Sequence, residues 1–184
     1  MSSIQPLVFS TERRLEPGRY RRDGFVPALS FEVGPGWFAV QDVPGFFDIE
    51  EAPGTPDVIA VQFARPVGFD DAGALVAAIA RRRRELFTGP KTSVEIDGAH
   101  GISIVVDAAD PDLADGRFVP VFDIGLGPVS IAAGRRLALT LLDTPSGLLA
   151  VLIGGSARRW EAAREAAAPV IASIRFDRAG SDDS

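Results

Sequence analysis

The sequence contains no cysteine in its 184 residues, and it contains one histidine, His100, and one lysine, Lys91. The absence of cysteine excludes disulfides, thiolate metal sites and cysteine nucleophiles. The single histidine leaves one side chain whose ordinary pKa lies near neutrality. No Gly-x-Ser-x-Gly motif is present, so the strand-to-helix turn that exposes a serine nucleophile in many hydrolases is also missing. Few of the side chains that most enzymes use are therefore available.

Positive charge is also scarce, with 19 basic against 25 acidic residues, a net charge of -6 and a pI near 4.8. Nucleic-acid-binding proteins usually carry a strongly basic face, so we expect no nucleic-acid partner. The chain lacks an apolar run long enough to span a membrane, and residues 1–10 lack the pattern of an export signal. Arginine in place of lysine, with abundant alanine and glycine, indicates a GC-rich bacterial genome.

The segment from Gly134 to Arg175 predicts a strand, a turn, a second strand and a helix. Residues 136–142 and 147–153 are almost continuously apolar, which is typical of strands covered on both faces. We expect Gly154 to Ser156 to end the second strand and Ser156 to cap the helix. Pro169 should mark a kink or a restart of that helix. The apolar stripe of the helix consists of Trp160, Ala163, Ala167, Val170, Ile171 and Ile174.

An earlier helix is predicted to begin at Asp70-Asp71 and to end at Gly89-Pro90, with Leu75, Ile79, Leu86 and neighbouring Val76 or Phe87 buried. Short apolar segments separated by turns predict roughly eight strands. The expected fold class is α+β, with an antiparallel β-sheet flanked by two main helices. Residues 1–17 would form an N-terminal arm or edge strand, residues 18–178 a single domain, and residues 179–184 a disordered tail.

Several short motifs resemble a group of actinobacterial secreted or lipoprotein-type proteins. They lie at Leu15 to Tyr20, Phe25 to Val33, Gly36-Trp37, Val94 to Gly98 and Ala172 to Phe176. This layout is similar to the PsbP-like fold, an αβα sandwich found in a photosystem extrinsic subunit, a Ran-binding import factor and bacterial lipoproteins. The resemblance implies a non-catalytic binding or accessory protein and relatives that are exported. It carries no catalytic residues over to this chain.

His100 and Asp123 are the candidate catalytic residues if the protein is an enzyme. His100 lies in the segment Asp97 to Gly101, which reads as the loop of a hairpin, so an exposed loop histidine is the favoured interpretation. Asp110, Asp112, Asp115 and Gly116 are reminiscent of a calcium loop, but their spacing departs from the motif and no glutamate follows at the required distance. We expect an acidic surface loop there, and neither a metal nor a cofactor.

Two binding sites are candidates. Ser156, Arg158 and Arg159 at the start of the second helix would offer N–H groups and guanidinium charge to an anion, although a simple strand-to-helix turn is favoured. The aromatic residues of two adjacent strands form the second candidate. Because neighbouring side chains of a strand point to opposite faces, one ring of each pair would stay exposed unless both faces are covered. These ligand or partner contacts are Trp37, Phe38, Phe46 and Phe47.

The sequence favours a non-catalytic binding or accessory domain that acts through contacts with a protein or a small ligand. One alternative is a small-molecule enzyme or carrier with a pocket between sheet and helix, using His100 or Asp123. Another is a structural homo-oligomer such as a homodimer. A deep pocket that contains His100 or Asp123 would favour the enzyme.

Overall fold

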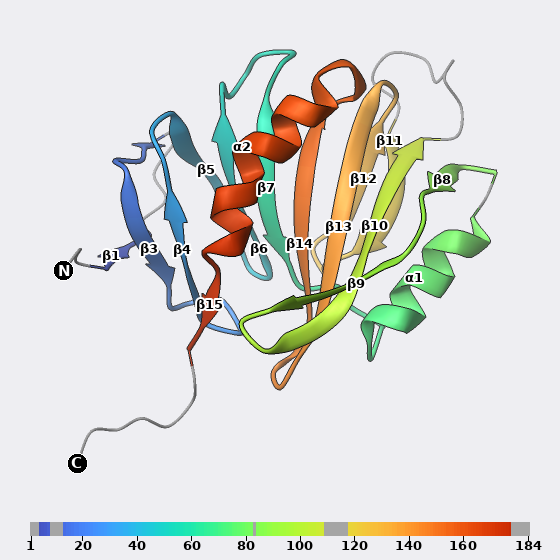
Figure 1. The fold of residues 1–184 in the computed structure, drawn as a ribbon. Helices are drawn as coiled ribbons and strands as arrows, with labels where there is room; N and C mark the ends of the chain where they lie inside the picture. The colour runs from blue at the N-terminus through green and yellow to red at the C-terminus, as the bar shows by residue number, and fades with distance from the viewer. Residues whose placement is uncertain (1–3, 8–12, 83, 109–117, 178–184) are drawn as a thin grey trace.

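The centre of the molecule is a nine-stranded antiparallel sheet, seen in a computed structural model that describes residues 4–7, 13–82, 84–108 and 118–177 (Figure 1). The strands run in the order β2-β5-β6-β7-β14-β13-β10-β8, and β9 also pairs with β10. Their bounds are β2 Arg13–Arg14, β5 Trp37–Val43, β6 Phe46–Glu51, β7 Ile59–Ala64, β8 Leu86–Thr88, β9 Thr92–Ile96, β10 Ala99–Ala108, β13 Arg135–Thr144 and β14 Gly147–Ser156.

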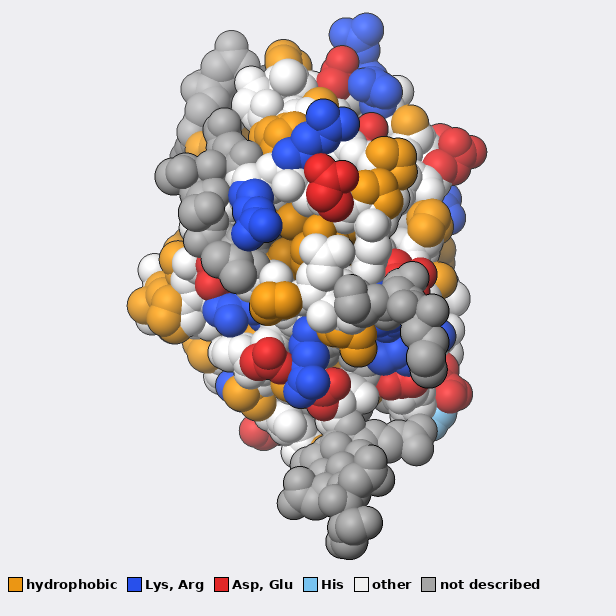
Figure 2. Space-filling model, turned by 90° about the vertical axis from the view of Figure 1, so that its left-hand side faces the viewer, with side chains coloured by type: hydrophobic (Ala, Val, Ile, Leu, Met, Phe, Trp, Pro, Cys, Tyr) orange, Lys and Arg blue, Asp and Glu red, His pale blue; other side chains and the backbone are white. Residues whose placement is uncertain are grey.

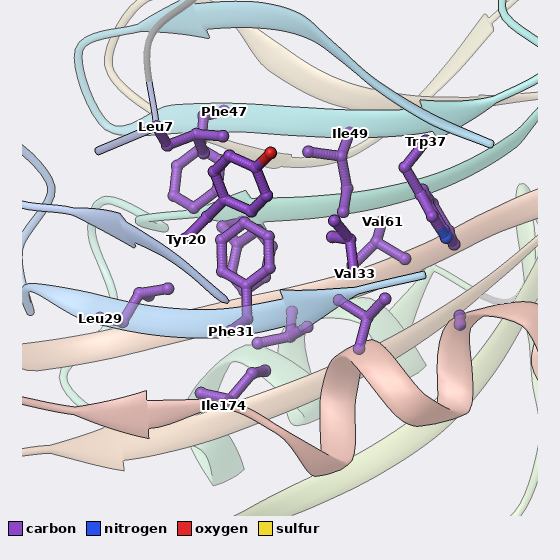
Figure 3. Packing of buried hydrophobic residues seen from close by; sticks show 14 of the residues in the cluster. Leu7, Tyr20, Leu29, Phe31, Val33, Trp37, Phe47, Ile49, Val61 and Ile174 are labelled. Carbon is purple, nitrogen blue, oxygen red and sulfur yellow. The ribbon is translucent and has the colours of Figure 1, made fainter. Parts of the chain in front are cut away.

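One face of this sheet is covered by helix α2 and by a small second sheet (Figure 1). Helix α2 spans Trp160–Ala172 after the 3-10 turn η1 at Ala157–Arg159. The small sheet runs β1-β3-β4-β15, with bounds Gln5–Pro6, Gly18–Arg22, Leu29–Val33 and Arg175–Phe176. Figure 3 shows its apolar side chains pointing toward those of β5, β6 and β7. The stacked rings of Phe31, Phe47 and Phe63 lie at the centre of this layer.

The opposite face is covered by helix α1, Ala72–Arg81, and by a hairpin of β11, Phe118–Asp123, and β12, Pro128–Ala132. Strand β14 alternates between the two cores, since Leu149 and Val151 face α2 whereas Ala150 and Leu152 face α1. This burial on both faces explains its continuously apolar sequence. The α+β class with antiparallel sheets and two helices is confirmed, but the simple αβα sandwich needs correction because strands cover much of each face.

Helix α1 is shorter than predicted and ends at Arg81 instead of Gly89. The Asp71 carboxylate caps its start by accepting from the Ala74 N–H at 2.7 Å, and Leu75, Val76 and Ile79 are buried as expected. Residues 86–88 form strand β8, because pairing with β10 satisfies their backbone groups. Leu86 is therefore buried as a strand residue, while Phe87 points to the other side and is 60% exposed.

The predicted hairpin of β13 and β14 is confirmed, and both strands are longer than expected. Gly154, Gly155 and Ser156 continue β14 instead of ending it, because β13 pairs with all three. Ser156 makes no side-chain capping bond to the following turn, so the predicted cap is wrong. Strand pairing has overridden the local preference of the glycines for a break.

Helix α2 ends at Ala172 and places Trp160, Ala163, Ala167 and Val170 in the core, as predicted, with Ile174 buried beyond its end. The helix continues through Pro169, so no restart occurs there. Proline has no N–H, so the Glu165 carbonyl lacks its usual hydrogen-bond donor within the helix. Pro169 and Glu165 are both exposed, on the solvent side of the helix. Water can satisfy that carbonyl, which explains why the proline is tolerated.

The first residues of the described chain join both sheets. β1 pairs with β3 in a parallel manner, β2 pairs with β5, and Leu7 and Leu15 are buried. The side of the molecule that carries the small sheet shows basic and acidic side chains next to one another (Figure 2). Strand β3 contributes ion pairs, such as that of Arg22 with Asp42 at 2.7 Å. No helix within the described residues is long and apolar enough to cross a membrane.

Candidate functional site: a groove between α2 and β9

A groove of about 940 Å³ lies between helix α2 and the edge strand β9, with β10, β13 and β14 as its floor. In Figure 1, β9 passes on the same side of the large sheet as α2. We call this feature the α2 groove. Its volume is at the upper end of the range of ligand pockets. Its lining residues from α2, from β9 and from the turn after β9 are Thr92, Val94, Glu95, Ile96, Asp97, Glu161, Arg164, Glu165, Ala168, Ile171 and Ala172.

The β9–β10 hairpin is held in this position by its turn. Asp97 and Gly98 both have positive φ, 48° and 82°, as a tight two-residue turn between antiparallel strands requires. The Asp97 carboxylate accepts from the Phe176 N–H at 2.8 Å and lies 3.8 Å from the Arg175 guanidinium. The turn is therefore attached to the segment that follows α2. His100 is the second residue of β10 and not a loop residue, which corrects the sequence prediction.

Strand β10 also approaches β13 unusually closely at Gly101. A Cβ at this position would lie 2.0 Å from the Leu141 carbonyl oxygen, a distance that no side chain allows. Only glycine fits, so Gly101 allows the two strands that form the groove floor to pack in this way.

The floor of the groove is mainly apolar and carries one polar pair. Val105, Ala138 and Ile153 of the floor are half-buried, as are Val94 on β9 and Ile171 on the helix wall. The polar pair consists of Thr140 and Ser103, whose hydroxyl oxygens lie 3.3 Å apart. An apolar floor with a few hydrogen-bonding groups is typical of a ligand-binding pocket.

The rim of the groove is acidic. The lining residues include four carboxylates, from Glu95, Asp97, Glu161 and Glu165, and two guanidinium groups, from Arg164 and Arg175. Four negative charges and two positive charges give a formal charge of -2. Glu161 lies 3.4 Å from the Arg164 guanidinium at an exposed position. The groove therefore offers apolar contact below and a negative potential at its rim.

The two candidate catalytic residues are not among those that line the α2 groove. The His100 side chain is 80% exposed, and its Nδ1 lies 3.5 Å from the Glu95 carboxylate. Asp123 is exposed at the end of β11, where its carboxylate accepts from the Gly125 N–H at 2.5 Å and stabilises the turn. The acidic loop at Asp110, Asp112, Asp115 and Gly116 lies outside the described residues.

The candidate anion site lies at the surface, where β14 ends and η1 begins. Arg158 and Arg159 are exposed, and the Arg159 guanidinium lies 3.4 Å from the Asp57 carboxylate. Ser156 is half-buried, and the helical segment after it begins as a 3-10 turn. Anion binding by these three residues stays a prediction.

The aromatic candidates belong mostly to the core. Trp37, Phe46 and Phe47 are buried, and Phe38 is half-buried. Strand β6 is covered on both faces, since Phe46 and Phe47 belong to opposite cores, whereas the face of β5 that carries Phe38 is only partly covered. A partner contact here stays a prediction, and of the four rings Phe38 retains the most surface.

Sequence reasoning missed Asp48, a carboxyl that is only 3% exposed in β6. It lies between Gln41 of β5 and Gln62 of β7, and it accepts from the Gln41 N–H at 2.9 Å. Burial, followed by the nearby Glu50 charge, raises the pKa of Asp48 to about 7. The signal in the sequence was a charged residue inside an apolar hairpin strand. A second cavity, of about 360 Å³, is lined by both glutamines.

No family model and no curated protein matches the sequence. The fold is similar to the solution structure of cyanobacterial PsbP (CyanoP) from Synechocystis sp. PCC 6803, with a TM-score of 0.51 and 12% identity over 86% of this chain and 91% of that chain. A crystal structure from Bacteroides thetaiotaomicron VPI-5482 has a TM-score of 0.45 and 10% identity over 83% of this chain and 46% of that chain. The first similarity shows a PsbP-like fold and nothing beyond the fold.

Proposed function

We propose that this protein is a non-catalytic binding or accessory domain that takes its ligand in the α2 groove. The observation that carries the proposal is the groove itself, which combines an apolar floor, a pair of hydroxyl groups and an acidic rim. The PsbP-like fold supports an accessory role, since the sequence resemblance implies the same. The enzyme or carrier alternative also places its pocket between sheet and helix, but the α2 groove is lined by neither His100 nor Asp123.

A neutral apolar dye tests the proposal without knowledge of the ligand. Nile red should bind and fluoresce, and the amide NMR shifts that it changes should belong to α2, β9, β10 and β13. Ala168 is exposed on the helix wall of the groove, so Ala168→Trp should fill the space and weaken dye binding roughly tenfold, the effect of losing about 1.4 kcal/mol.

Two variants provide controls for this experiment. Ala157→Trp introduces the same ring at an exposed site that does not line the groove, and His100→Ala removes the only histidine. Both should bind the dye as the unmodified chain does. Shift changes that map elsewhere, or equal binding by Ala168→Trp and Ala157→Trp, would refute the groove as the site.

A further inference from the structure

We propose, building on the function above, that the occupant of the α2 groove is an extended segment of a partner protein with apolar and basic residues. This segment would pair with the free edge of β9 as an added strand. The proposal names the ligand class of the groove and depends on three features of the described residues. These are the unpaired edge of β9, the size and apolar floor of the groove, and the charge at its rim.

Strand β9 has a paired edge and a free edge. Its paired edge faces β10, from Ile96 opposite Ala99 to Thr92 opposite Ser103, and no described strand pairs with the other edge. In an antiparallel pair, alternate residues direct their N–H and C=O groups toward the partner strand. Ile96 flanks the two-residue turn, so its own N–H and C=O groups point toward β10. Because the direction alternates along the strand, the N–H and C=O groups of Ser93 and Glu95 point away from β10, to the free edge. An edge of this kind is a template for another strand.

The groove beside this edge has the dimensions of an extended peptide. The five residues of β9 span about 17 Å at roughly 3.3 Å per residue, which matches a peptide of five or six residues. The half-buried side chains of Val94 and Ile96 share one face of β9, so the apolar residues of the peptide would pack on that face. Alternate residues of the peptide would then lie on the face that carries Glu95.

The charge of the rim selects a basic segment. Glu95 would lie opposite a lysine or arginine of the added strand, and Glu161 and Glu165 on α2 add to the negative potential. A peptide with acidic residues at the same positions would meet repulsion. The whole chain, with its net charge of -6, reinforces this preference.

A capped seven-residue peptide that alternates valine with lysine provides a defined probe. We expect it to displace Nile red and to slow hydrogen exchange of the Ser93 or Glu95 amide. Two further peptides carry backbone N-methyl groups, one on the valines and the other on the lysines. Since only one set of N–H groups can face β9, one of these peptides should lose roughly tenfold or more in affinity while the other keeps it.

The preference for a basic peptide is tested by changing the charge of the peptide and of the groove. A valine–glutamate peptide should bind more weakly than the valine–lysine peptide, and Glu95→Gln or Glu165→Gln should weaken the latter roughly two- to fivefold, as expected for an exposed ion pair. Glu16→Gln removes an exposed carboxylate outside the groove and should have no effect. Thermal melts by circular dichroism check that each variant is folded.

The outcomes separate this inference from the function on which it depends. Equal affinity of the two N-methylated peptides would exclude strand pairing, and equal affinity of the lysine and glutamate peptides would exclude the basic preference. If Nile red binds in the groove but no peptide binds at about 1 mM, the peptide inference fails and the binding function stands. If neither binds, the binding function fails as well.

Discussion

Asp48 is held in a position that water hardly reaches, with Gln41 and Gln62 on either side. Its pKa is raised from 3.8 to about 7, mainly because burial disfavours the charged form and also because Glu50 lies nearby. The native state therefore binds a proton more tightly than the unfolded state. The free energy of unfolding must then decrease as the pH rises from about 4 to about 7, and level off above that.

We expect Asp48→Asn to remove this dependence, because the amide remains neutral and its oxygen can still accept from the Gln41 N–H. At pH 8 the variant should be more stable by a few kcal/mol, with an upper limit of about 4 kcal/mol from a shift of about three pKa units. At pH 4 the two proteins should have nearly equal stability. Urea unfolding at both pH values measures this difference, and a variant that is less stable at pH 8 would contradict it.

Trp160 is the first residue of α2 and is 6% exposed, with the Arg136 guanidinium 5.8 Å from the centre of its ring. Trp160→Ala should cost about 3–5 kcal/mol, the usual range for removing a buried aromatic ring. Trp160→Phe keeps most of the apolar area and should cost less. A loss below about 1 kcal/mol in denaturant melts would show that the ring does not anchor the helix.

At the scale of elements, the contact between α2 and β14 depends on one glycine. A Cβ on Gly155 would lie 2.9 Å from the Ala163 Cβ, so the helix could not keep its present distance from the strand. The neighbouring Gly154 has room, since the closest atom to a Cβ there is 3.8 Å away. The two glycines are adjacent in sequence but differ in packing.

Gly155→Ala should therefore destabilise the protein by about 1–3 kcal/mol through overpacking. The matched variant Gly154→Ala should stay within about 0.5 kcal/mol of the unmodified chain or become slightly more stable. Thermal or urea unfolding of the two variants makes the comparison. Equal effects would mean that α2 can shift away from β14 without cost.

Elements whose signals lie within one continuous segment of the sequence were predictable. The β13–β14 hairpin has two apolar runs around a proline-containing turn, and α2 has a helical stripe that begins at Trp160. The end of α1 was not predictable in the same way. Residues 86–88 continue a helical apolar pattern, but they become β8 because a strand distant in sequence pairs with them.

At the scale of the whole molecule, the large sheet is covered on both faces, and the α2 groove lies where that cover is incomplete. On one face, α2 and the small sheet cover β5, β6, β7 and most of β14, whereas the floor of the groove is formed by β10, β13 and Ile153 of β14. The apolar surface left there is unusual for a sheet that is otherwise buried, and it is the reason why a ligand is expected at this place.

The sequence by itself determined the fold class, the large hairpin and the apolar stripe of α2, because these depend on neighbours within a few residues or on a single periodicity. It also determined the acidic charge and the absence of cysteine chemistry. Only the tertiary structure decided that Trp37, Phe46 and Phe47 are buried while Phe38 stays half-exposed. It also decided the burial of Asp48 and the α2 groove, since both arise where segments far apart in the chain meet. Side-chain burial and groove shape depend on such long-range packing, which no local pattern records.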